Sequence, residues 1–341
     1  MRVGFISFAH FHAWTYGDLL ARMCDVTIAA ISDADVPRGR KAADRYRCPF
    51  IPDYHAMLQD DTIDCVIICA ETVRHAEIVV SAAQAGKAIL CEKPMALNLD
   101  DAHRMIAACQ ETRVYFQLAL PNRYLGPIRD VKDAVDRGNI GRVHAVHSTN
   151  RGKNPGGWFL DPHQSGGGAL IDHTIHAVDI LRWVLNAEIT EVYAEMGHMG
   201  TSASVEDIAL LTMMFDNGVI ASHDPSWSYI PSRLEWGDLT FEFVGDRGGL
   251  RVDGFSQGVV VYDNRHPQIT RVPVGLPKEY FMLREFLDHC LSVHGGSAYG
   301  IDGLRALEVT LAAYQSAALH RPIFIRDVRI SAKEGDADGT H

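Results

Sequence analysis

The chain has 341 residues, of which 47% are hydrophobic and 22% are charged. This composition is typical of a folded protein of about two domains and excludes a disordered or fibrous chain. The formal net charge is −11 and no basic cluster offsets it, so neither nucleic acid nor an anionic membrane surface is an expected partner.

Neither a membrane span nor a secretion signal is predicted. The best apolar run, residues 66–70, is far shorter than the roughly 20 residues that cross a bilayer. Residues 2–8 are too short for the apolar part of a signal peptide and read as a strand. Cys65, Cys69 and Cys91 lie in apolar runs, where a free thiol behaves as a small hydrophobic side chain. We therefore expect a cytoplasmic protein without a disulfide framework.

The first third of the chain alternates strand and helix signals. The predicted strands are residues 2–8, 26–31, 64–69, 88–91 and 114–118. The predicted helices are residues 14–24, 37–46, 75–85 and 99–111. Continuous apolar strands that alternate with helices of about ten residues or more indicate a parallel sheet covered on both faces. We expect a doubly wound α/β domain over residues 1–121.

The pattern changes after Pro121, where strands with alternating polar and apolar residues and tight turns become common. Asn217-Gly218 stands between two apolar runs and predicts a type I′ hairpin. The other predicted strands are residues 238–244, 249–252, 258–262 and 268–274, and the predicted helices are 127–137, 168–186, 278–293 and 302–320. We expect an α+β domain with a mainly antiparallel sheet over residues 122–329. Residues 330–341 are expected to form a mobile tail.

The N-terminal strand, turn and helix, followed by a strand that ends in an acid, have the order of a dinucleotide-binding unit. The acid, Asp33, stands where a carboxylate can accept both ribose hydroxyls of an adenosine. The usual glycines are missing, because their three slots fall at Ser7, Ala9 and His12. The rings of His10 and His12 and the N-terminus of the helix could supply donors to a diphosphate instead. A domain whose first turn binds no ligand is the alternative.

A second candidate site is the segment Cys91-Glu92-Lys93-Pro94-Met95-Ala96. It follows the predicted strand 88–91, at the carboxyl edge where open α/β sheets bind their ligands. This position, fixed by a following proline, is unusual for a lysine that only carries a solvated surface charge. We therefore favour a functional Lys93 over a plain turn lysine.

A third candidate site is the helix that begins at Gly166-Gly167-Gly168. Asp172 and His176 are four residues apart and share one face, and Asp179 lies three residues further on. A carboxylate beside an imidazole orients it and suits it to proton transfer near neutral pH. The glycines permit close approach of a substrate or of another backbone. A core helix with one hydrogen-bonded histidine is the alternative.

A metal site on this helix is disfavoured. It would use Asp172, His173 and His176, but the first two are adjacent in sequence and point about 100° apart on a helix. We expect no metal.

With Glu92-Lys93-Pro94 and the run from Gly166 to Asp179 both in view, residues 2–325 resemble the glucose–fructose oxidoreductase / inositol dehydrogenase / MocA (Gfo/Idh/MocA) family. The resemblance implies an N-terminal Rossmann domain and a C-terminal domain with a large open sheet. That sheet would form the interface of a homodimer or homotetramer. The resemblance also implies oxidation or reduction of a sugar, polyol or related carbonyl with NAD or NADP.

The resemblance also assigns roles to residues. Lys93 would touch the reacting hydroxyl and the nicotinamide ribose, His176 would take the hydroxyl proton as hydride leaves for C4 of the nicotinamide, and Asp172 would hold the substrate. The expected cofactor contacts are Ser7, Phe8, Ala9, His10, His12, Asp33, Ala70, Glu71, His75, Glu92 and Lys93. The expected substrate contacts are Arg123, Arg151, Trp158, Asp172, His173, His176 and Trp227. Core or interface roles for the tryptophans are the alternative.

Cofactor choice and reaction type stay open at this point. Asp33 favours NAD, because its charge would repel the 2′-phosphate of NADP. NADP is left open by the nearby residues Ser32, Arg38 and Arg40. A redox-neutral enzyme that oxidises a sugar only transiently is a second possible function. A ligand-sensing regulator is a third, although retention of Lys93, Asp172 and His176 argues against it.

Overall fold

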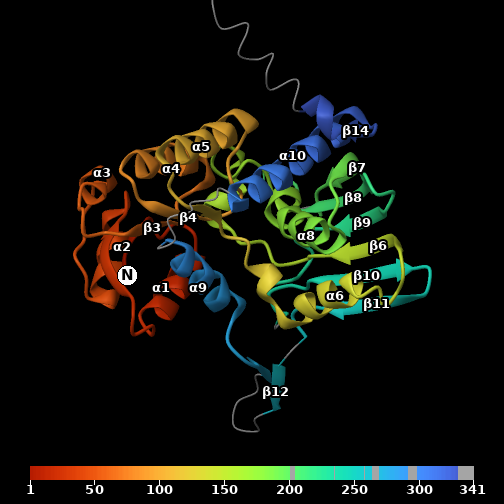
Figure 1. The fold of residues 1–341 in the computed structure, drawn as a ribbon, viewed down its shortest axis with the longest axis horizontal. Helices are drawn as coiled ribbons and strands as arrows, with labels where there is room; N and C mark the ends of the chain where they lie inside the picture. Colours follow the sequence, from red (N-terminus) through yellow and green to blue (C-terminus); the bar gives the residue numbers. More distant parts are fainter. Residues whose placement is uncertain (200–203, 234, 257, 263–268, 291–297, 329–341) are drawn as a thin grey trace, which may run out of the picture. The chain divides into compact units, whose positions relative to one another are not determined.

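The computed structural model describes residues 1–199, 204–233, 235–256, 258–262, 269–290 and 298–328. Its contacts divide the chain into two compact units, which are described separately (Figure 1). The first unit contains Met1–Pro121, His163–Gly166 and Glu279–Arg305. The second contains the described parts of Asn122–Pro162, Gly167–Lys278 and Ala306–His341.

The first unit is built on a five-stranded parallel sheet in the order β2-β1-β3-β4-β5. Its strands are β1 (Arg2–Ile6), β2 (Thr27–Ser32), β3 (Cys65–Ile68), β4 (Ala88–Cys91) and β5 (Phe116–Leu118). Its helices in the first third are α1 (His12–Leu20), α2 (Val36–Tyr46), α3 (Tyr54–Leu58), α4 (His75–Gln84) and α5 (Leu99–Thr112). Every residue of β3 and β4 is buried, as continuous apolar strands in a parallel sheet require. The predicted doubly wound α/β domain is confirmed.

The first unit also contains most of α9 (Lys278–Cys290) and the start of α10 (Ala298–Leu319). The sequence pattern assigns these segments to the second domain, so this placement differs from the expected boundaries. Phe286 of α9 stacks on Tyr115 with ring centroids 6.0 Å apart. A Cβ atom on Gly303 of α10 would lie 2.7 Å from the side chain of Leu118. These contacts complete the core beside β5, and hydrophobic periodicity alone does not reveal such a return of the chain.

The second unit is built on a seven-stranded sheet in the order β11-β10-β6-β9-β8-β7-β14. Its strands are β6 (Val143–Thr149), β7 (Ile189–Gly197), β8 (Ile208–Phe215), β9 (Ile220–Asp224), β10 (Thr240–Gly245), β11 (Gly248–Asp253) and β14 (Ile323–Phe324). Every neighbouring pair is antiparallel except β6 and β9, which are parallel. The mainly antiparallel sheet is therefore confirmed.

Helices α6 (Gly126–Asp136) and α8 (Ala169–Leu185) pack on each other and on strands of this sheet. The shorter helical segments are η1 (Thr72–Arg74), η2 (Pro121–Tyr124), η3 (Gly157–Leu160) and α7 (Pro162–Ser165). Strands β12 (Gly258–Tyr262) and β13 (Ile269–Pro273) pair with each other in a separate two-stranded sheet rather than extending the large one. The predicted tail, residues 330–341, lies outside the described residues.

The hairpin between β8 and β9 forms where Asn217-Gly218 predicts it, but its turn is not type I′. That type needs a positive φ at both central residues, whereas Gly218 has φ +86° and Asn217 is not among the positive-φ residues. The N–H of Gly218 donates to the carbonyl of Phe215, and the N–H of Phe215 donates to the carbonyl of Val219. This is the pattern of a type I turn with a bulge at glycine. The Oδ1 atom of Asn217 accepts the N–H of Val219 and supports that conformation.

The seven-stranded sheet has an open face that carries apolar side chains. Along β8 the burial alternates, and Leu210 is 60% exposed. Ile220 on β9 and Val244 on β10 are also exposed. Within the described ranges, no helix combines the length and apolar character needed to cross a bilayer.

Candidate active site

The turn between β1 and α1 keeps the path of a glycine turn although serine occupies the first slot. Ser7 has φ +70°, in the left-handed region where glycine is favoured. Its N–H donates to the carbonyl of Ser32 at 2.7 Å. Its hydroxyl oxygen accepts the N–H of Ala9 at 3.1 Å. These two bonds hold serine in the conformation that a phosphate-binding turn requires.

Phe8, an expected cofactor contact, has its side chain in the core. Its ring centroid lies 5.2 Å from that of Phe5 and 4.9 Å from that of Trp14. Its backbone N–H donates to Asp33 at 2.8 Å. The side chain of Phe8 therefore supports the turn from within the protein.

The Asp33 carboxylate follows β2 and is filled by donors from the chain itself. One oxygen accepts the N–H of Asp35 and Nη2 of Arg38, at 2.9 and 2.7 Å. The other accepts the N–H of Phe8 and Nε of Arg38, each at 2.8 Å. A carboxylate has about four lone-pair positions, so a ribose hydroxyl can bond to Asp33 only when Arg38 moves. The expected ribose contact of Asp33 stays a prediction with that condition attached.

His75, another expected cofactor contact, joins two loops. It is fully buried. Its Nδ1 lies 2.9 Å from the carbonyl oxygen of Pro94 and its Nε2 lies 3.1 Å from that of Ala70. Burial lowers the pKa of His75, and a neutral ring donates only one of these two bonds at a time. His75 thus ties the loop after β3 to the loop that carries Lys93. Glu71, next to Ala70, lies 3.9 Å from the guanidinium of Arg38.

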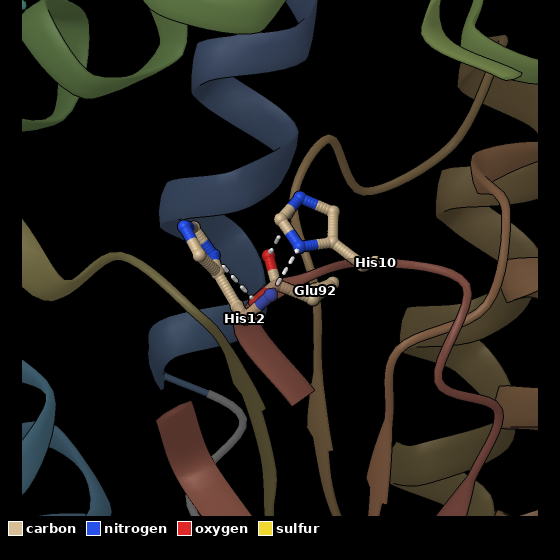
Figure 2. A group of neighbouring side chains, drawn as sticks. All are labelled: His10, His12 and Glu92. Atoms are coloured by element: carbon tan, nitrogen blue, oxygen red, sulfur yellow. Dashed lines mark hydrogen bonds and ion pairs between the residues drawn. The ribbon is translucent and has the colours of Figure 1, made fainter. Parts of the chain in front are cut away.

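Glu92 is a buried carboxylate on which several donors converge (Figure 2). One oxygen lies 3.0 Å from Nδ1 of His12 and accepts the hydroxyl of Tyr16 at 2.5 Å. The other accepts the N–H of Lys93 at 3.1 Å and lies 3.8 Å from Nε2 of His10. Burial alone would raise the pKa of Glu92, but the two histidines and the hydroxyl hold it well below its ordinary value. Glu92 is therefore an anion that links the first turn to the Lys93 loop.

Lys93 follows β4 at the carboxyl edge of the parallel sheet, and only 4% of its surface is exposed. A solvated turn lysine would leave its ammonium group in water. Lys93 is instead buried, which supports a functional role, and that role stays a prediction. Ionisable groups buried at such an edge are candidates for a functional site.

On α8, Asp172, His173 and His176 are all buried in a helix that is otherwise apolar. Oδ2 of Asp172 accepts the indole N–H of Trp227 at 3.1 Å and lies 3.3 Å from Nε2 of His173. The adjacent side chains therefore meet, although adjacent residues leave a helix in different directions. Nδ1 of His173 donates to the carbonyl oxygen of Pro225 at 2.9 Å. Pairing of Asp172 with His176 stays a prediction.

The glycines that open α8 make room for Glu206 and Tyr314. The carboxylate of Glu206 accepts the N–H groups of Gly168 and Leu170, at 2.9 and 3.0 Å, and the hydroxyl of Tyr314 at 2.8 Å. A Cβ atom on Gly168 would lie 2.0 Å from the carbonyl oxygen of Glu206, and one on Gly167 would lie 1.9 Å from the Tyr314 hydroxyl. The close neighbour that the glycines admit is therefore another part of the chain.

Two expected substrate contacts are arginines that already hold carboxylates. Arg123 forms a bidentate pair with buried Asp179, so Asp179 faces an arginine rather than standing alone beside His176. Arg151 donates to Asp238 through Nε and Nη2, at 2.9 and 2.6 Å. A substrate would have to use the remaining N–H groups of these side chains.

The two expected tryptophan contacts lie in or against the core of the second unit. Trp227 is 3% exposed and belongs to a buried cluster with Phe159. Trp158 packs against that cluster and stacks on Phe159, with ring centroids 4.0 Å apart. Trp227 still reaches the site through its bond to Asp172.

The candidate residues have three partners that the sequence pattern does not single out: Tyr16 in the first unit, and Glu206 and Tyr314 in the second. Glu206 lies 36 to 38 residues from its backbone donors and Tyr314 lies 108 residues from Glu206. Tyr16 reaches Glu92 across 76 residues. No local spacing encodes such pairings.

Comparison with known proteins shows which family the chain matches. Residues 2–120 match the family described as oxidoreductase family, NAD-binding Rossmann fold, and residues 128–251 match the GFO/IDH/MocA C-terminal domain. A myo-inositol 2-dehydrogenase of Thermotoga maritima is 28% identical over 96% of this chain and 99% of its own. A 1,5-anhydro-D-fructose reductase of Ensifer adhaerens is 30% identical over 77% of this chain and 80% of its own.

The fold comparison agrees. The crystal structure of GenD2 from gentamicin A biosynthesis, in complex with NAD, superposes with a TM-score of 0.87 at 25% identity, covering 95% of this chain and 96% of that one. The resemblance seen in the sequence is confirmed at both domains. The chain belongs to the GFO/IDH/MocA family of oxidoreductases and has its NAD-binding Rossmann domain.

Proposed function

We propose that this protein is a dehydrogenase that moves a hydride between NAD(H) and a secondary hydroxyl or carbonyl of a sugar-like or polyol-like substrate. The observation that carries the proposal is the burial of Lys93, Asp172 and His176, which are 4, 8 and 8% exposed. Ionisable side chains buried in this way are candidates for a functional site. The names of the inositol dehydrogenase and anhydrofructose reductase relatives support the substrate class.

In this proposal each side chain has one task. NAD supplies the hydride acceptor when it is bound. His176 accepts the hydroxyl proton, since an imidazole changes its charge near neutral pH and suits general base catalysis. Lys93 donates a hydrogen bond to the reacting oxygen. Asp172, held by the Trp227 indole, accepts a substrate hydroxyl.

The residues of the first unit fit a dinucleotide. Ser7 keeps the left-handed backbone of the usual turn, and the turn leads directly into α1, whose N-terminus favours a diphosphate. We infer a preference for NAD over NADP from the charge of Asp33. Arg38, which now pairs with Asp33, is the residue that would soften that preference.

We also propose that the protein assembles as a homodimer or homotetramer through the open face of the seven-stranded sheet. The exposed Leu210, Ile220 and Val244 would be covered by a second copy. An apolar sheet face of this kind is usually buried in an assembly.

The experiment is a substrate panel with purified protein and NAD⁺ or NADP⁺, followed by the absorbance of the reduced cofactor. Inositols, anhydrohexoses and other polyols are the first compounds to try. Net formation of NADH with at least one of them is expected. Binding of NADH without net turnover, while a glycoside is cleaved or eliminated, would contradict a dehydrogenase and favour a redox-neutral enzyme.

A further inference from the structure

We propose that the imidazolium form of His12 binds the diphosphate of NAD(H) in place of the missing glycine, so that cofactor binding takes up one proton. This inference rests on the proposed NAD-dependent function. It concerns the third slot of the phosphate-binding turn, which is normally a glycine. In this chain His12 is the first residue of α1.

The backbone at this position is already engaged. The N–H of His12 donates to Nδ1 of His10 at 3.2 Å. In a glycine turn, backbone N–H groups at the start of the helix are the usual partners of a phosphate. Here a side chain of the same turn has taken that donor. The ring of His12 is the nearest chemical replacement.

The orientation of the His12 ring decides which nitrogen can meet a ligand. Nδ1 faces the ionised Glu92 at 3.0 Å, and since a carboxylate only accepts, Nδ1 carries the proton. Nε2 lies on the side of the ring away from Glu92 (Figure 2). The His12 side chain is 24% exposed, whereas that of His10 is 1% exposed. Nε2 of His12 is therefore the ring atom directed out of the cluster.

The protonation state of Nε2 determines what it offers. In the neutral ring Nε2 carries a lone pair, which repels a diphosphate oxygen. In the imidazolium it is a charged N–H donor, and such bonds to phosphate are among the stronger ones. A diphosphate thus selects the protonated ring, and binding must draw a proton from solvent whenever the free ring is neutral.

The charged and titratable neighbours of His12 lie on several elements. Glu92, after β4, presents a carboxylate oxygen to Nδ1 of His12 at 3.0 Å. His10, whose ring centroid is 4.3 Å away, uses Nδ1 as an acceptor and carries its proton on Nε2. Tyr16 on α1 stays neutral, because burial and then the Glu92 charge raise its pKa. The backbone N–H of Lys93 donates to Glu92. The charge of Glu279, on α9, adds to the raised pKa of Tyr16.

The same three side chains could in principle form a cation site, since one ligand atom from each of His10, His12 and Glu92 lies within 4.8 Å of the others. The hydrogen bonds argue against it. A histidine that binds a metal normally donates its other N–H to an acceptor, whereas Nδ1 of His10 accepts one. Glu92 already accepts bonds from Tyr16 and Lys93 as well as from His12.

The test is calorimetric titration of the full protein with NADH between about pH 6 and pH 9, in two buffers that differ in ionisation enthalpy. At the alkaline end we expect uptake approaching one proton and an affinity that falls about tenfold per pH unit, as linkage requires. His12→Gly restores the family glycine, and His12→Gln keeps a donor without charge. Both should bind NADH with little proton uptake and a flat pH profile.

The matched control is His103→Gln, which removes an exposed histidine on α5 and should behave like the unchanged protein. Proton uptake that persists in both His12 variants, or a flat profile in the unchanged protein, would overturn the inference. Zinc that stays bound after dialysis and is lost in the His12 variants would replace it with a metal site. Absence of NADH binding at every pH would instead contradict the proposed function.

Discussion

Replacing Glu206 with alanine should destabilise the protein by about 4 kcal/mol. The change leaves three buried donors without their acceptor: the N–H groups of Gly168 and Leu170 and the hydroxyl of Tyr314. Each unmet buried donor costs about 1–3 kcal/mol, and water entering the vacated space recovers part of that. For a unit of this size the melting temperature should fall by about 8–16 °C.

Glu206→Gln separates the acceptor from the charge. Glutamine keeps one carbonyl oxygen that can accept the same bonds, so its cost at neutral pH should stay below about 1 kcal/mol. Thermal unfolding by circular dichroism and calorimetry measures both variants. An alanine variant that melts like the unchanged protein would refute the reasoning, as would a glutamine variant as unstable as alanine.

The pH dependence gives a second readout. Burial raises the pKa of Glu206 in the folded state, even though Tyr314 and the backbone donors oppose the shift. A carboxyl with a raised folded pKa stabilises most below its unfolded pKa and loses that contribution as pH rises through the folded pKa. Relative to Glu206→Gln, which cannot titrate, the unchanged protein should therefore lose stability from about pH 4 upward.

Further outcomes are expected at the chemistry, the cofactor site and the interface. His176→Ala and Lys93→Ala should each lower kcat about a hundredfold or more, the scale for losing a general acid or base. A His176→Ala enzyme with near-normal kcat at every pH from about 6 to 9 would assign the proton elsewhere. Arg38→Ala should raise the ratio of the Kd for NADPH to the Kd for NADH about tenfold, and Asp33→Ala should lower that ratio. Calorimetry that shows an unchanged ratio in either variant would contradict the corresponding prediction. Light scattering should show a dimer or larger, and Leu210→Asp should dissociate it; a monomer before mutation would refute the interface.

The fold was predictable because its signals are local and repeated. Strands β3 and β4 are short, wholly apolar and followed by helices, and strands of this kind are typical of a parallel sheet covered on both faces. Along β8 only the burial alternates, because the strand sequence is almost wholly apolar; the local signal for its hairpin is Asn217-Gly218. By contrast, the return of α9 and α10 to the first unit depends on contacts such as Phe286 with Tyr115, which no periodicity reports.

The structure shows the contacts of the candidate site residues, and several differ from those that the sequence suggests. The spacing of Asp172 and His176 places them on one face of α8, yet the contacts seen for Asp172 are with His173 and Trp227. Side-chain rotation lets neighbours meet, and helix geometry alone does not include it. The Asp33 carboxylate was expected to accept the ribose hydroxyls, but in the structure it accepts hydrogen bonds from Arg38, five residues later in the chain. Such local competition for a carboxylate is decided by side-chain conformation.

The left-handed Ser7 changes what the dinucleotide fingerprint means. The first glycine of that motif is required for its positive backbone angle φ. Ser7 adopts this angle, with φ +70°, and its hydroxyl accepts a hydrogen bond from the N–H of Ala9. A search that matches letters would pass over this turn, whereas one that scores backbone shape would find it.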